Sequence, residues 1–432
     1  MIEDGWRIIG GRPLQGRVRP SGSKNGALPT LAATLLLEGE ALLHNVPRIA
    51  DVETMLGLLR SFGLAAEWAA DGSLRVVNRG IETHRAPLEL AGRMRASHYL
   101  LGPLLARLGR AEIPYPGGCA IGERPVDYIL AGLEALGGES RVDEAGIRVR
   151  AMRLVGARFS LDPVFRSPGA TFNLLMAASL ARGSTVIENA SFEPDVIAFC
   201  QYLTAAGAQI EGAGTTSITV RGRKALHSVE HTVNCDRLEA GTFFCAASAS
   251  RGAITVEGIG RGELGAIPDK LEEAGVLLQE RDGGLTAVGT ERPRGISVVT
   301  EPFPHFPTDL QPPLAAVLAT AEGTSSVRDS IFDMRLQYVE PLLAMGASIR
   351  QLDARTVEIA GVPRLHGATV EAFNIRDGAA LVVAALGAEG ESHVLGRRFV
   401  ARGYQDLDSK LRALGAEISL IEQPSQTVAD RP

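Results

Sequence analysis

Residues 179–190 read SLARGSTVIENA and hold the pattern on which the fold prediction depends. A run rich in leucine and alanine ends at Gly183, and a short apolar strand begins directly after it. A glycine at such a place often ends a helix with a positive φ, which other residues adopt only at a cost. The same helix–glycine–strand pattern recurs every 67 to 74 residues, with its glycines at Gly39, Gly109, Gly183, Gly252, Gly323 and Gly390.

A second pattern keeps phase with the first. It reads Leu-x-x-apolar-Gly, as in YLTAAGA at residues 202–208, and it recurs every 68 to 74 residues. Its glycines are Gly63, Gly137, Gly207, Gly275, Gly346 and Gly415. Helix–glycine–strand junctions occur in any α/β protein, but two patterns that share one period along the whole chain indicate six copies of one unit. Six copies suggest two domains of three.

Length and composition limit the class of protein. A chain of 432 residues is too long for one ordinary core, so two or three domains are expected. Hydrophobic residues make up 45% of the chain and aromatic residues only 5%, so the core is expected to be aliphatic and rich in alanine. The net charge of −6 argues against nucleic acid or an anionic membrane as the main partner.

The sequence shows no targeting or membrane segment. The N-terminal MIEDGWRIIGG contains acidic residues and lacks the apolar segment of a signal peptide. No apolar run reaches the ~20 residues of a membrane helix, so a cytoplasmic protein is expected. The four cysteines form no C-x-x-C pair, which argues against a zinc site or a redox dithiol. No metal and no cofactor are predicted.

Two segments contain unusual cationic or nucleophilic residues. Residues 20–26 place Lys24 among small residues directly before a helical run, where a cation and free backbone N–H groups form a candidate anion site. An exposed loop lysine is the alternative. Residues 115–127 place Cys119 near Arg124 in a loop with three glycines and two prolines. A neighbouring cation lowers the pKa of a thiol, so Cys119 is predicted to be reactive.

A third segment, residues 303–310, is rich in proline and presents Asp309 at the start of a helical run. Asp309 is interpreted either as a general base or as an N-terminal helix cap. His305 in the same segment is expected to pack against its proline and phenylalanine neighbours. The other cysteines lie in apolar or helical contexts and are predicted to be structural; they are Cys200, Cys235 and Cys245.

Isolated arginines near predicted helix starts form the fourth feature. Each is either a solvated surface charge or, together with the others, part of a pocket for a small polyanion. They are Arg95, Arg335, Arg376 and Arg402.

These segments together resemble the enolpyruvyl transferase family over nearly the whole chain. The strongest matches are SGSKNGALP, MRAS, PGGCAIGERPVDYILAGLEALG, DRLEAGTF and PFPHFPTDLQ. The resemblance implies an α/β (α+β) fold, a two-domain inside-out α/β barrel of six βαβαββ repeats with three in each domain. One discontinuous domain would comprise residues 1–22 and 234–432, and the other residues 23–233 with the Cys119 loop as a lid. Residues 422–432 are expected to be a disordered tail.

The resemblance also implies an activity. The family transfers the enolpyruvyl group of phosphoenolpyruvate to a hydroxyl group and releases phosphate, without a cofactor. For this chain the implied acceptor is the 3-hydroxyl of UDP-N-acetylglucosamine, in the first committed step of peptidoglycan synthesis. Two alternatives remain open: transfer to UMP or a related uridine nucleotide in nucleoside-antibiotic biosynthesis, and a catalytically weak paralogue that binds a UDP-sugar or has a regulatory role. A monomer or weak homo-oligomer is expected.

Residue roles follow from the same resemblance. Cys119 would protonate the methylene carbon or hold phosphoenolpyruvate covalently, and Asp309 would take the proton of the acceptor hydroxyl. The full catalytic set is Cys119, Asp309, Lys24, Arg402 and Asn374. Phosphoenolpyruvate would be bound by Lys24, Arg95, Arg124 and Arg402. The acceptor would be bound by Asn25, Arg124, Pro125, Val126, Asp127, Ser167, Gly169, Thr308, Asp309 and Ile331. Domain closure would be braced by Arg335 and Arg376.

The chain departs from the family pattern at four places. Asn374 stands where the family has an aspartate that helps in proton traffic, and an asparagine can hydrogen-bond but cannot ionise. Met334 replaces an asparagine, a lysine is usual near Phe165, and Phe172 replaces a glutamate. The residues assigned to phosphoenolpyruvate remain. The departures therefore concern the acceptor and the reacting centre, not the donor.

Overall fold

The structure of the protein, a computed structural model, describes residues 4–115, 126–281 and 283–421. Within these ranges no helix combines the length and the apolar character needed to cross a membrane. The predicted loop residues Cys119, Arg124 and Pro125, and the predicted tail at 422–432, lie outside the described residues.

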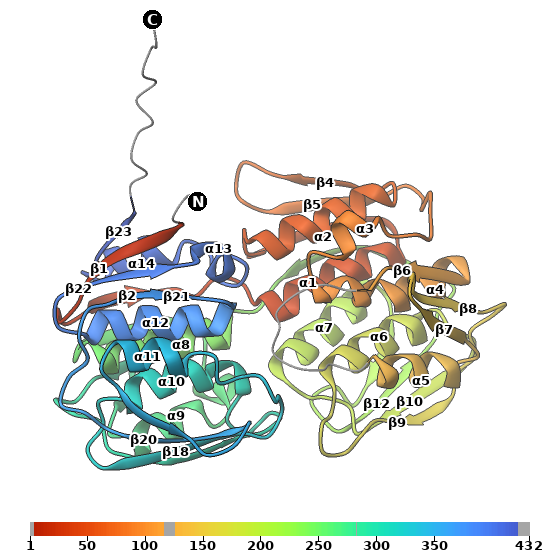
Figure 1. Cartoon of the computed structure of the whole chain (residues 1–432). Coiled ribbons are helices and arrows are strands. Elements are labelled where there is room, and N and C mark those ends of the chain that lie inside the picture. The colour runs from red at the N-terminus through yellow and green to blue at the C-terminus, as the bar shows by residue number, and fades with distance from the viewer. Residues whose placement is uncertain (1–3, 116–125, 282, 422–432) are drawn as a thin grey trace, which may run out of the picture.

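The chain forms two lobes that lie side by side (Figure 1). The buried apolar residues fall into two clusters, and each cluster is the core of one lobe. Lobe 1 has the core formed by residues 6–18 together with residues 235–418. Lobe 2 has the core formed by residues 27–233. Both cores are aliphatic and rich in alanine, as the composition predicts.

Lobe 1 contains three four-stranded sheets. In the first, the strands lie in the order β21 (Thr369–Glu371), β22 (Glu391–Leu395), β1 (Gly5–Ile9) and β23 (Glu417–Leu420). In the second, the order is β15 (Leu277–Arg281), β16 (Gly284–Val288), β14 (Ala253–Glu257) and β2 (Gln15–Val18). In the third, it is β17 (Ser297–Thr300), β18 (Thr324–Asp329), β20 (Thr356–Ala360) and β19 (Ser348–Gln351). The N-terminal strands thus belong to the lobe that holds the C-terminal half of the chain (Figure 1).

In the described part of the chain, lobe 2 contains two four-stranded sheets and one three-stranded sheet. In the first, the strands lie in the order β11 (Gln209–Glu211), β12 (Ser217–Arg221), β10 (Ser184–Glu188) and β9 (Arg158–Ser160). In the second, the order is β13 (Leu226–Thr232), β3 (Leu37–His44), β5 (Leu74–Asn78) and β4 (Ala65–Trp68). The three-stranded sheet has the order β6 (Arg110–Ile113), β8 (Gly146–Arg150) and β7 (Glu139–Asp143).

All the sheets follow one plan. In each four-stranded sheet one inner strand has a parallel neighbour on one side and two antiparallel strands on the other, as β10 has β9 on one side and β12 with β11 on the other. In the three-stranded sheet a single parallel bridge from Arg85 to Glu112 takes the place of the parallel strand. Six units of one topology are therefore present, as the sequence repeats predict.

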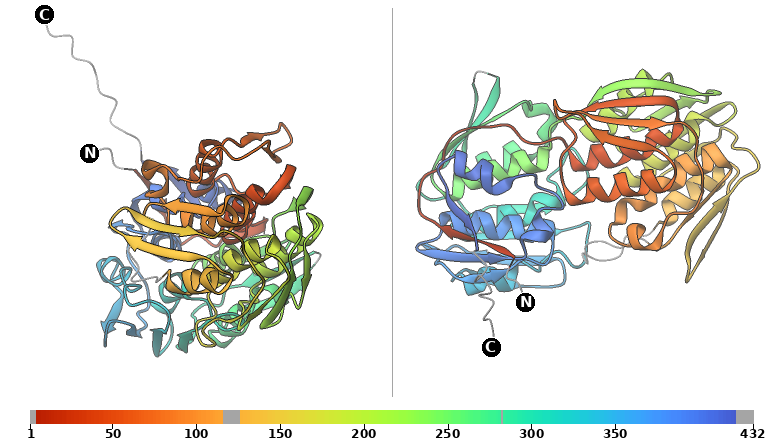
Figure 2. Two further views of the ribbon diagram at one scale, coloured as in Figure 1. Left: turned by 90° about the vertical axis from the view of Figure 1, so that its right-hand side faces the viewer. Right: turned by 90° about the horizontal axis from the view of Figure 1, so that it is seen from above.

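Helices fill the interior of each lobe, and the strands surround them (Figure 2). Of the 13 residues of α12, 12 are buried, and a helix that is apolar on all sides is one that lies inside a core. The inner helices are α1 (Lys24–Ala33), α4 (Leu101–Leu108) and α6 (Pro168–Ser179) in lobe 2, and α8 (Arg237–Ala249), α10 (Gln311–Leu318) and α12 (Ile375–Gly387) in lobe 1. The predicted inside-out α/β barrel fold is confirmed.

The remaining helices are shorter or more exposed. They are α2 (Ala50–Ser61), α3 (Leu88–Ala91), α5 (Asp127–Ala135), α7 (Pro194–Ala205), α9 (Ile267–Glu273), α11 (Val339–Ala344), α13 (Arg397–Val400) and α14 (Leu407–Ala413), with the 3-10 helices η1 (Thr34–Leu36), η2 (Arg95–Leu100), η3 (Arg261–Leu264) and η4 (Thr308–Leu310).

The repeated glycines have the predicted conformation, with one exception. Eleven of the twelve have a positive φ, and Gly252 does not. At that junction Arg251 takes the left-handed conformation instead, with a φ of 56°. A Cβ atom on Gly252 would collide with the carbonyl oxygen of Leu14. Gly252 is therefore required for space and not for its φ.

The two passages of the chain between the lobes run next to each other. Ser23 N–H donates to the Asn234 carbonyl at 2.7 Å, and Asp236 N–H donates to the Ser21 carbonyl at 2.9 Å. These hydrogen bonds fix the start of α1 beside the start of α8, so both lobes contribute to the region around Lys24. The predicted domain boundaries, 1–22 with 234–432 against 23–233, stay a prediction.

Candidate active site

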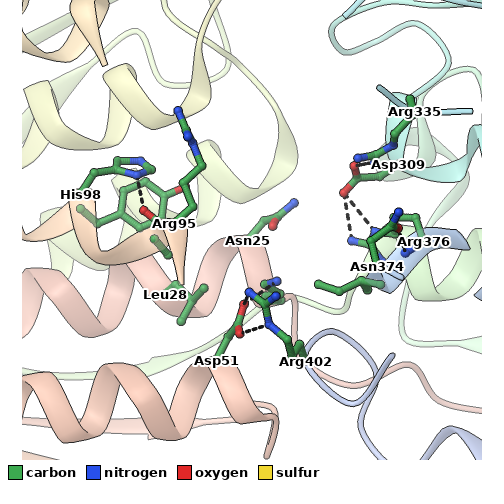
Figure 3. A pocket seen from close by; sticks show the side chains of 14 residues that line it. Asn25, Leu28, Asp51, Arg95, His98, Asp309, Arg335, Asn374, Arg376 and Arg402 are labelled. Carbon is green, nitrogen blue, oxygen red and sulfur yellow. Dashed lines mark hydrogen bonds and ion pairs between the residues drawn. The ribbon is translucent and has the colours of Figure 1, made fainter. Parts of the chain in front are cut away.

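A cleft between the lobes brings together side chains from both (Figure 3). Lobe 2 contributes the start of α1, the start of α2 and η2. Lobe 1 contributes η4, the segment between β18 and α11, the start of α12 and the segment that follows α13. The lining residues are Lys24, Asn25, Leu28, Asp51, Arg95, Ala96, His98 and Tyr99 from lobe 2, and Asp309, Arg335, Asn374, Ile375, Arg376 and Arg402 from lobe 1.

Lys24 and Arg402 are held by one carboxylate, that of Asp51. Lys24 Nζ lies 2.7 Å from Asp51 Oδ2, and Arg402 Nε donates to Asp51 Oδ1 at 2.8 Å. Lys24 is the first residue of α1, which Ser23 caps by accepting a hydrogen bond from Gly26 N–H at 3.2 Å. The side chain of Lys24 is only 14% exposed, so the alternative of an exposed loop lysine is wrong.

No sequence pattern singles out Asp51, because an acidic residue in the first turn of a helix is common. In the structure its carboxyl is buried. Burial alone would raise the pKa of Asp51, but Lys24 and Arg402 outweigh that effect and lower this pKa below its usual value. Asp51 therefore stays ionised, and two cations share its single negative charge.

Gly26 lets the start of α1 approach a buried polar pair. Asn234 Nδ2 donates to Asp195 Oδ1 at 2.8 Å. A Cβ atom on Gly26 would lie 2.9 Å from Asn234 Oδ1 and 3.2 Å from Asp195 Oδ1. Burial raises the pKa of Asp195 to about 6, against the opposing effect of Asn234. Gly26, the second glycine of SGSKNGALP, is therefore required because a larger residue would not fit at this position.

Asp309 is clamped by two buried arginines. Arg335 forms an ion pair with Asp309 Oδ1, and Arg376 donates to Oδ2 through Nε at 3.1 Å, with its Nη2 at 3.0 Å. The side chains of Arg335 and Arg376 are 2% and 6% exposed, so they are not solvated surface charges. Asp309 lies inside η4, whose cap position is Pro307 without a side-chain bond, so the interpretation as an N-terminal cap is wrong.

Asn374 caps α12. Its Oδ1 accepts hydrogen bonds from the backbone N–H groups of Arg376 and Asp377, both at 3.0 Å. Its Nδ2 donates to Gln337 Oε1 at 3.0 Å and to Asp377 Oδ2. The amide is therefore oriented by the protein at the edge of the cleft.

Arg95 begins η2, and its carbonyl accepts a hydrogen bond from His98 Nδ1 at 2.6 Å (Figure 3). Arg95, His98 and Asn25 line the cleft and also an adjoining pocket. The two spaces therefore meet at these side chains and at Asp309.

The adjoining pocket has a volume of about 260 Å³ and contains most of the residues predicted to bind the acceptor. Seven of the eight described ones line it, and Asp127 does not. The seven are Asn25, Val126, Ser167, Gly169, Thr308, Asp309 and Ile331. Ser167 is held in place because it caps α6 and accepts a hydrogen bond from Ala170 N–H at 3.2 Å.

Aromatic rings form much of this pocket, a feature that the sequence analysis missed. Phe165 lines the pocket and stacks on Tyr128, with ring centroids 6.2 Å apart and an interplanar angle of 21°. Phe303 also lines it and contacts Phe192 edge to face, with centroids 5.8 Å apart. A stacked ring such as that of Phe165 offers a flat face to a planar ligand group.

A buried ion pair adjoins the same wall and joins the lobes. Arg237 Nη2 of α8 donates to Glu193 Oε2 at 3.1 Å, and the guanidinium lies 5.4 Å from the ring centre of Phe303. Arg237 lies in the quoted motif DRLEAGTF, but no spacing in the sequence pointed to Glu193 as its partner.

The described cysteines and His305 have no place in the cleft. Burial raises the pKa values of Cys200, Cys235 and Cys245, that of Cys200 to about 12, so none is a ready nucleophile and the structural interpretation fits. His305 was expected to pack, which is wrong: its side chain is 63% exposed and its Nδ1 lies 3.6 Å from Glu301 Oε2. Among the described residues no group of three or more His, Cys, Asp or Glu is placed to hold a metal ion.

Comparison with known proteins gives consistent results along the whole chain. The family model for EPSP synthase (3-phosphoshikimate 1-carboxyvinyltransferase) matches residues 8–411. A UDP-N-acetylglucosamine 1-carboxyvinyltransferase 3 of Symbiobacterium thermophilum is 45% identical over 98% of this chain and 99% of its own length. A UDP-N-acetylglucosamine 1-carboxyvinyltransferase of Cellvibrio japonicus is 43% identical over 97% of this chain and 100% of its own length.

A solved structure shows the same fold. The enolpyruvyl transferase NikO from Streptomyces tendae superposes with a TM-score of 0.87 at 26% sequence identity, covering 98% of this chain and 100% of that one. Together with the six-unit architecture and the cleft between the lobes, these matches place the chain in the EPSP synthase family, the enolpyruvyl transferases.

Proposed function

We propose that this chain transfers the enolpyruvyl (1-carboxyvinyl) group of phosphoenolpyruvate to the 3-hydroxyl of UDP-N-acetylglucosamine and releases phosphate. Relatives that share 43% to 45% identity over nearly the full length carry this activity in their names. The observation that carries the proposal for this chain is the cleft itself. It places a cationic pair, Lys24 and Arg402, opposite a carboxylate, Asp309, and it adjoins the pocket of about 260 Å³ described above.

The donor side needs positive charge. Phosphoenolpyruvate carries a phosphate and a carboxylate, and phosphate becomes the leaving group. Lys24 and Arg402 have one negative charge between them, that of Asp51, so the cluster keeps a net positive charge for the donor. Arg95 lines the same cleft. Preorganised cations of this kind stabilise a leaving phosphate without reorganisation during the reaction.

The acceptor side needs a base and a shaped pocket. The 3-hydroxyl of the sugar gives up its proton as its oxygen bonds to C2 of phosphoenolpyruvate, while a proton is added to the methylene carbon. The adduct then loses phosphate and a proton from the new methyl group. Asp309 takes the hydroxyl proton in this scheme, because it lines both the cleft and the acceptor pocket. The carbon acid is assigned to Cys119, which lies outside the described residues.

The nucleotide fits the other end of the acceptor pocket. Phe165, Phe303 and Ile331 give that pocket an apolar wall, on which a uracil ring can stack. Arg95 and Arg237 are the cations that line this pocket among the described residues, and Arg237 shares its charge with Glu193 of the same lining. The lysine that is usual in the family near Phe165 is missing from this chain, and no lysine lines this pocket among the described residues.

Phosphate release from phosphoenolpyruvate tests the proposal, with UDP-N-acetylglucosamine, UMP or no acceptor added in parallel. We expect release only with the UDP-sugar, and the product should carry a carboxyvinyl ether detectable by mass spectrometry. Release with UMP alone would move the protein to nucleotide modification, the first alternative. Release with neither acceptor would favour a binding or regulatory protein.

A further inference from the structure

The amide of Asn374 has no hydrogen-bonding capacity left for a substrate. A carboxamide offers two N–H donors and an oxygen with two lone pairs. Both lone pairs accept from backbone N–H groups, those of Arg376 and Asp377. Both donors are used as well, one by Gln337 and one by Asp377. Asn374 therefore acts as a helix cap in a fixed orientation. The group beside it that can exchange a proton is the carboxyl of Asp377.

That neighbour, Asp377, is a buried carboxyl group in the first turn of α12. It is 2% exposed, and its Oδ2 accepts a hydrogen bond from Asn374. Its Oδ1 is buried without a hydrogen-bond partner among the described residues. Burial raises the pKa of Asp377 to about 7, against the opposing effects of Arg335 and Asn374. A buried carboxyl oxygen without a hydrogen-bond partner destabilises the folded state, and a purely structural role for Asp377 would not explain why this oxygen is left unpaired.

The charges around Asp377 link it to Asp309. The charge of Arg335 acts on Asp377, and the same guanidinium forms an ion pair with Asp309. Arg376, the residue before Asp377, holds the other oxygen of Asp309. When Asp377 is ionised, two arginines therefore face two carboxylates. When it is protonated, the two arginines face one carboxylate, and the group carries a net positive charge.

Other charged and titratable groups surround this cluster. Tyr338, which precedes α11, feels the charges of Asp377 and Asp329, and burial raises its pKa far above neutrality. On the side facing α8, Tyr404 and Asp236 act on Arg376, and burial raises the pKa of Tyr404 as well. Both tyrosines therefore stay protonated at neutral pH, whereas the pKa of Asp377 is about 7.

We propose that Asp377 is a positioning residue for activation of the acceptor hydroxyl. Its carboxylate fixes the Asn374 amide and balances the charge of Arg335, so that Asp309 can take up the hydroxyl proton. A nearby negative charge favours proton uptake by a carboxylate. This inference rests on the proposed function. Because the ionised form acts, the turnover number should rise with pH through about 7.

The test compares wild type with Asp377→Asn, which keeps the shape of the side chain and removes its charge. We expect kcat at about pH 8.5 to fall about tenfold, the effect of one pKa unit of interaction, with KM for phosphoenolpyruvate within about twofold. The rise of kcat through neutral pH should disappear. The double variant Asn374→Asp/Asp377→Asn returns one carboxylate to the pair and should recover part of the activity. Asp408→Asn, on α14 beside Arg412, is the matched control.

Thermal unfolding gives a readout that needs no substrate. The folded-state pKa of Asp377 lies above its unfolded value of 3.8, so this group favours the folded state at low pH and that stability is lost as pH rises through about 7. Asp377→Asn should therefore gain Tm relative to wild type as pH rises. A Tm difference that does not vary with pH would overturn the inference.

The two proposals fail in different ways. A wild-type protein that releases no phosphate with UDP-N-acetylglucosamine contradicts the proposed function. An active wild type together with an Asp377→Asn variant that keeps the wild-type kcat and pH profile contradicts the role of Asp377. An equal loss of kcat at every pH, with no recovery in the double variant, would do the same.

Discussion

Arg402 and Asp51 are joined by a hydrogen bond of 2.8 Å from Nε to Oδ1, although 351 residues separate them in the chain. Arg402 belongs to lobe 1 and Asp51 to lobe 2, so this bond ties the lobes together inside the cleft. Lys24 holds the other oxygen of Asp51 at 2.7 Å. A phosphate that enters here meets two cations already in place, and it competes with a single carboxylate for them.

Replacing Asp51 by asparagine should destabilise the free protein and strengthen its response to phosphate. Lys24 and Arg402 would face each other without a counter-charge, and breaking a buried pair in this way costs roughly 3–5 kcal/mol. An added anion would then relieve the repulsion. We expect a lower Tm for Asp51→Asn and a larger rise in Tm with inorganic phosphate or phosphoenolpyruvate than in wild type. An unchanged phosphate response would show that Asp51 does not control these cations.

The same carboxylate predicts an acid dependence. The folded-state pKa of Asp51 lies below its unfolded value of 3.8, so its stabilising contribution is complete above that value and is lost as pH falls below it. The Tm of wild type should therefore drop more steeply than that of Asp51→Asn under acidic conditions. Melting curves recorded between about pH 2 and pH 5 check this, with Asp408→Asn as the control outside the cleft. Parallel curves for wild type and Asp51→Asn would contradict it.

The fold was predictable because its signals are local and repeated. A glycine that ends a helix, followed by a short apolar strand, is visible in any window of about twelve residues. Six occurrences in phase then fix the architecture. Gly252 shows the limit, because its role depends on Leu14, which lies far away in the sequence. Such a steric requirement leaves no local pattern.

The site was only half predictable, for the same reason. Lys24 and Asp309 lie in segments of unusual composition, and that composition indicates a functional site. Asp51 is an ordinary residue in a helix start, and only folding brings it to Arg402. Asp377 is a single acidic residue within a predicted helical segment, and its burial near Arg335 depends on how α12 packs. Long-range ion pairs and burial are three-dimensional facts that one sequence does not display.

Replacing Asp309 by asparagine should remove most turnover and leave donor binding in place. The carboxylate is assigned to the hydroxyl proton, and loss of a general base costs about 10²- to 10⁴-fold in rate. We expect kcat to fall by at least about a hundredfold, with KM for phosphoenolpyruvate within about twofold because Lys24 and Arg402 are untouched. Asp333→Asn, an exposed carboxylate paired with Arg355, is the control. A kcat within about threefold of wild type would rule out Asp309 as the base.

Replacing Phe165 by alanine should weaken acceptor binding selectively. The ring lines the acceptor pocket and stacks on Tyr128, so its loss removes an apolar surface for the nucleotide and frees the Tyr128 ring. With a loss of about 1.5 kcal/mol, KM for UDP-N-acetylglucosamine should rise about tenfold, and KM for phosphoenolpyruvate should stay constant. Val164→Ala is a neighbouring control, since Val164 is 79% exposed and does not line the pocket. Equal changes in both KM values would place Phe165 outside the acceptor site.

An epoxide analogue of phosphoenolpyruvate should label the protein at one cysteine. Burial raises the pKa values of Cys200, Cys235 and Cys245, which keeps these thiols protonated and slow to react. Cys119, next to the glycines and Arg124 of its segment, is the predicted nucleophile. Mass spectrometry of the digested adduct should place the label on Cys119, and Cys119→Ala should remain unlabelled. Because the other thiols are buried, label on any of them would mean that the reagent reached an opened protein. If Cys119 carries no label, the assignment of Cys119 to the donor site is wrong.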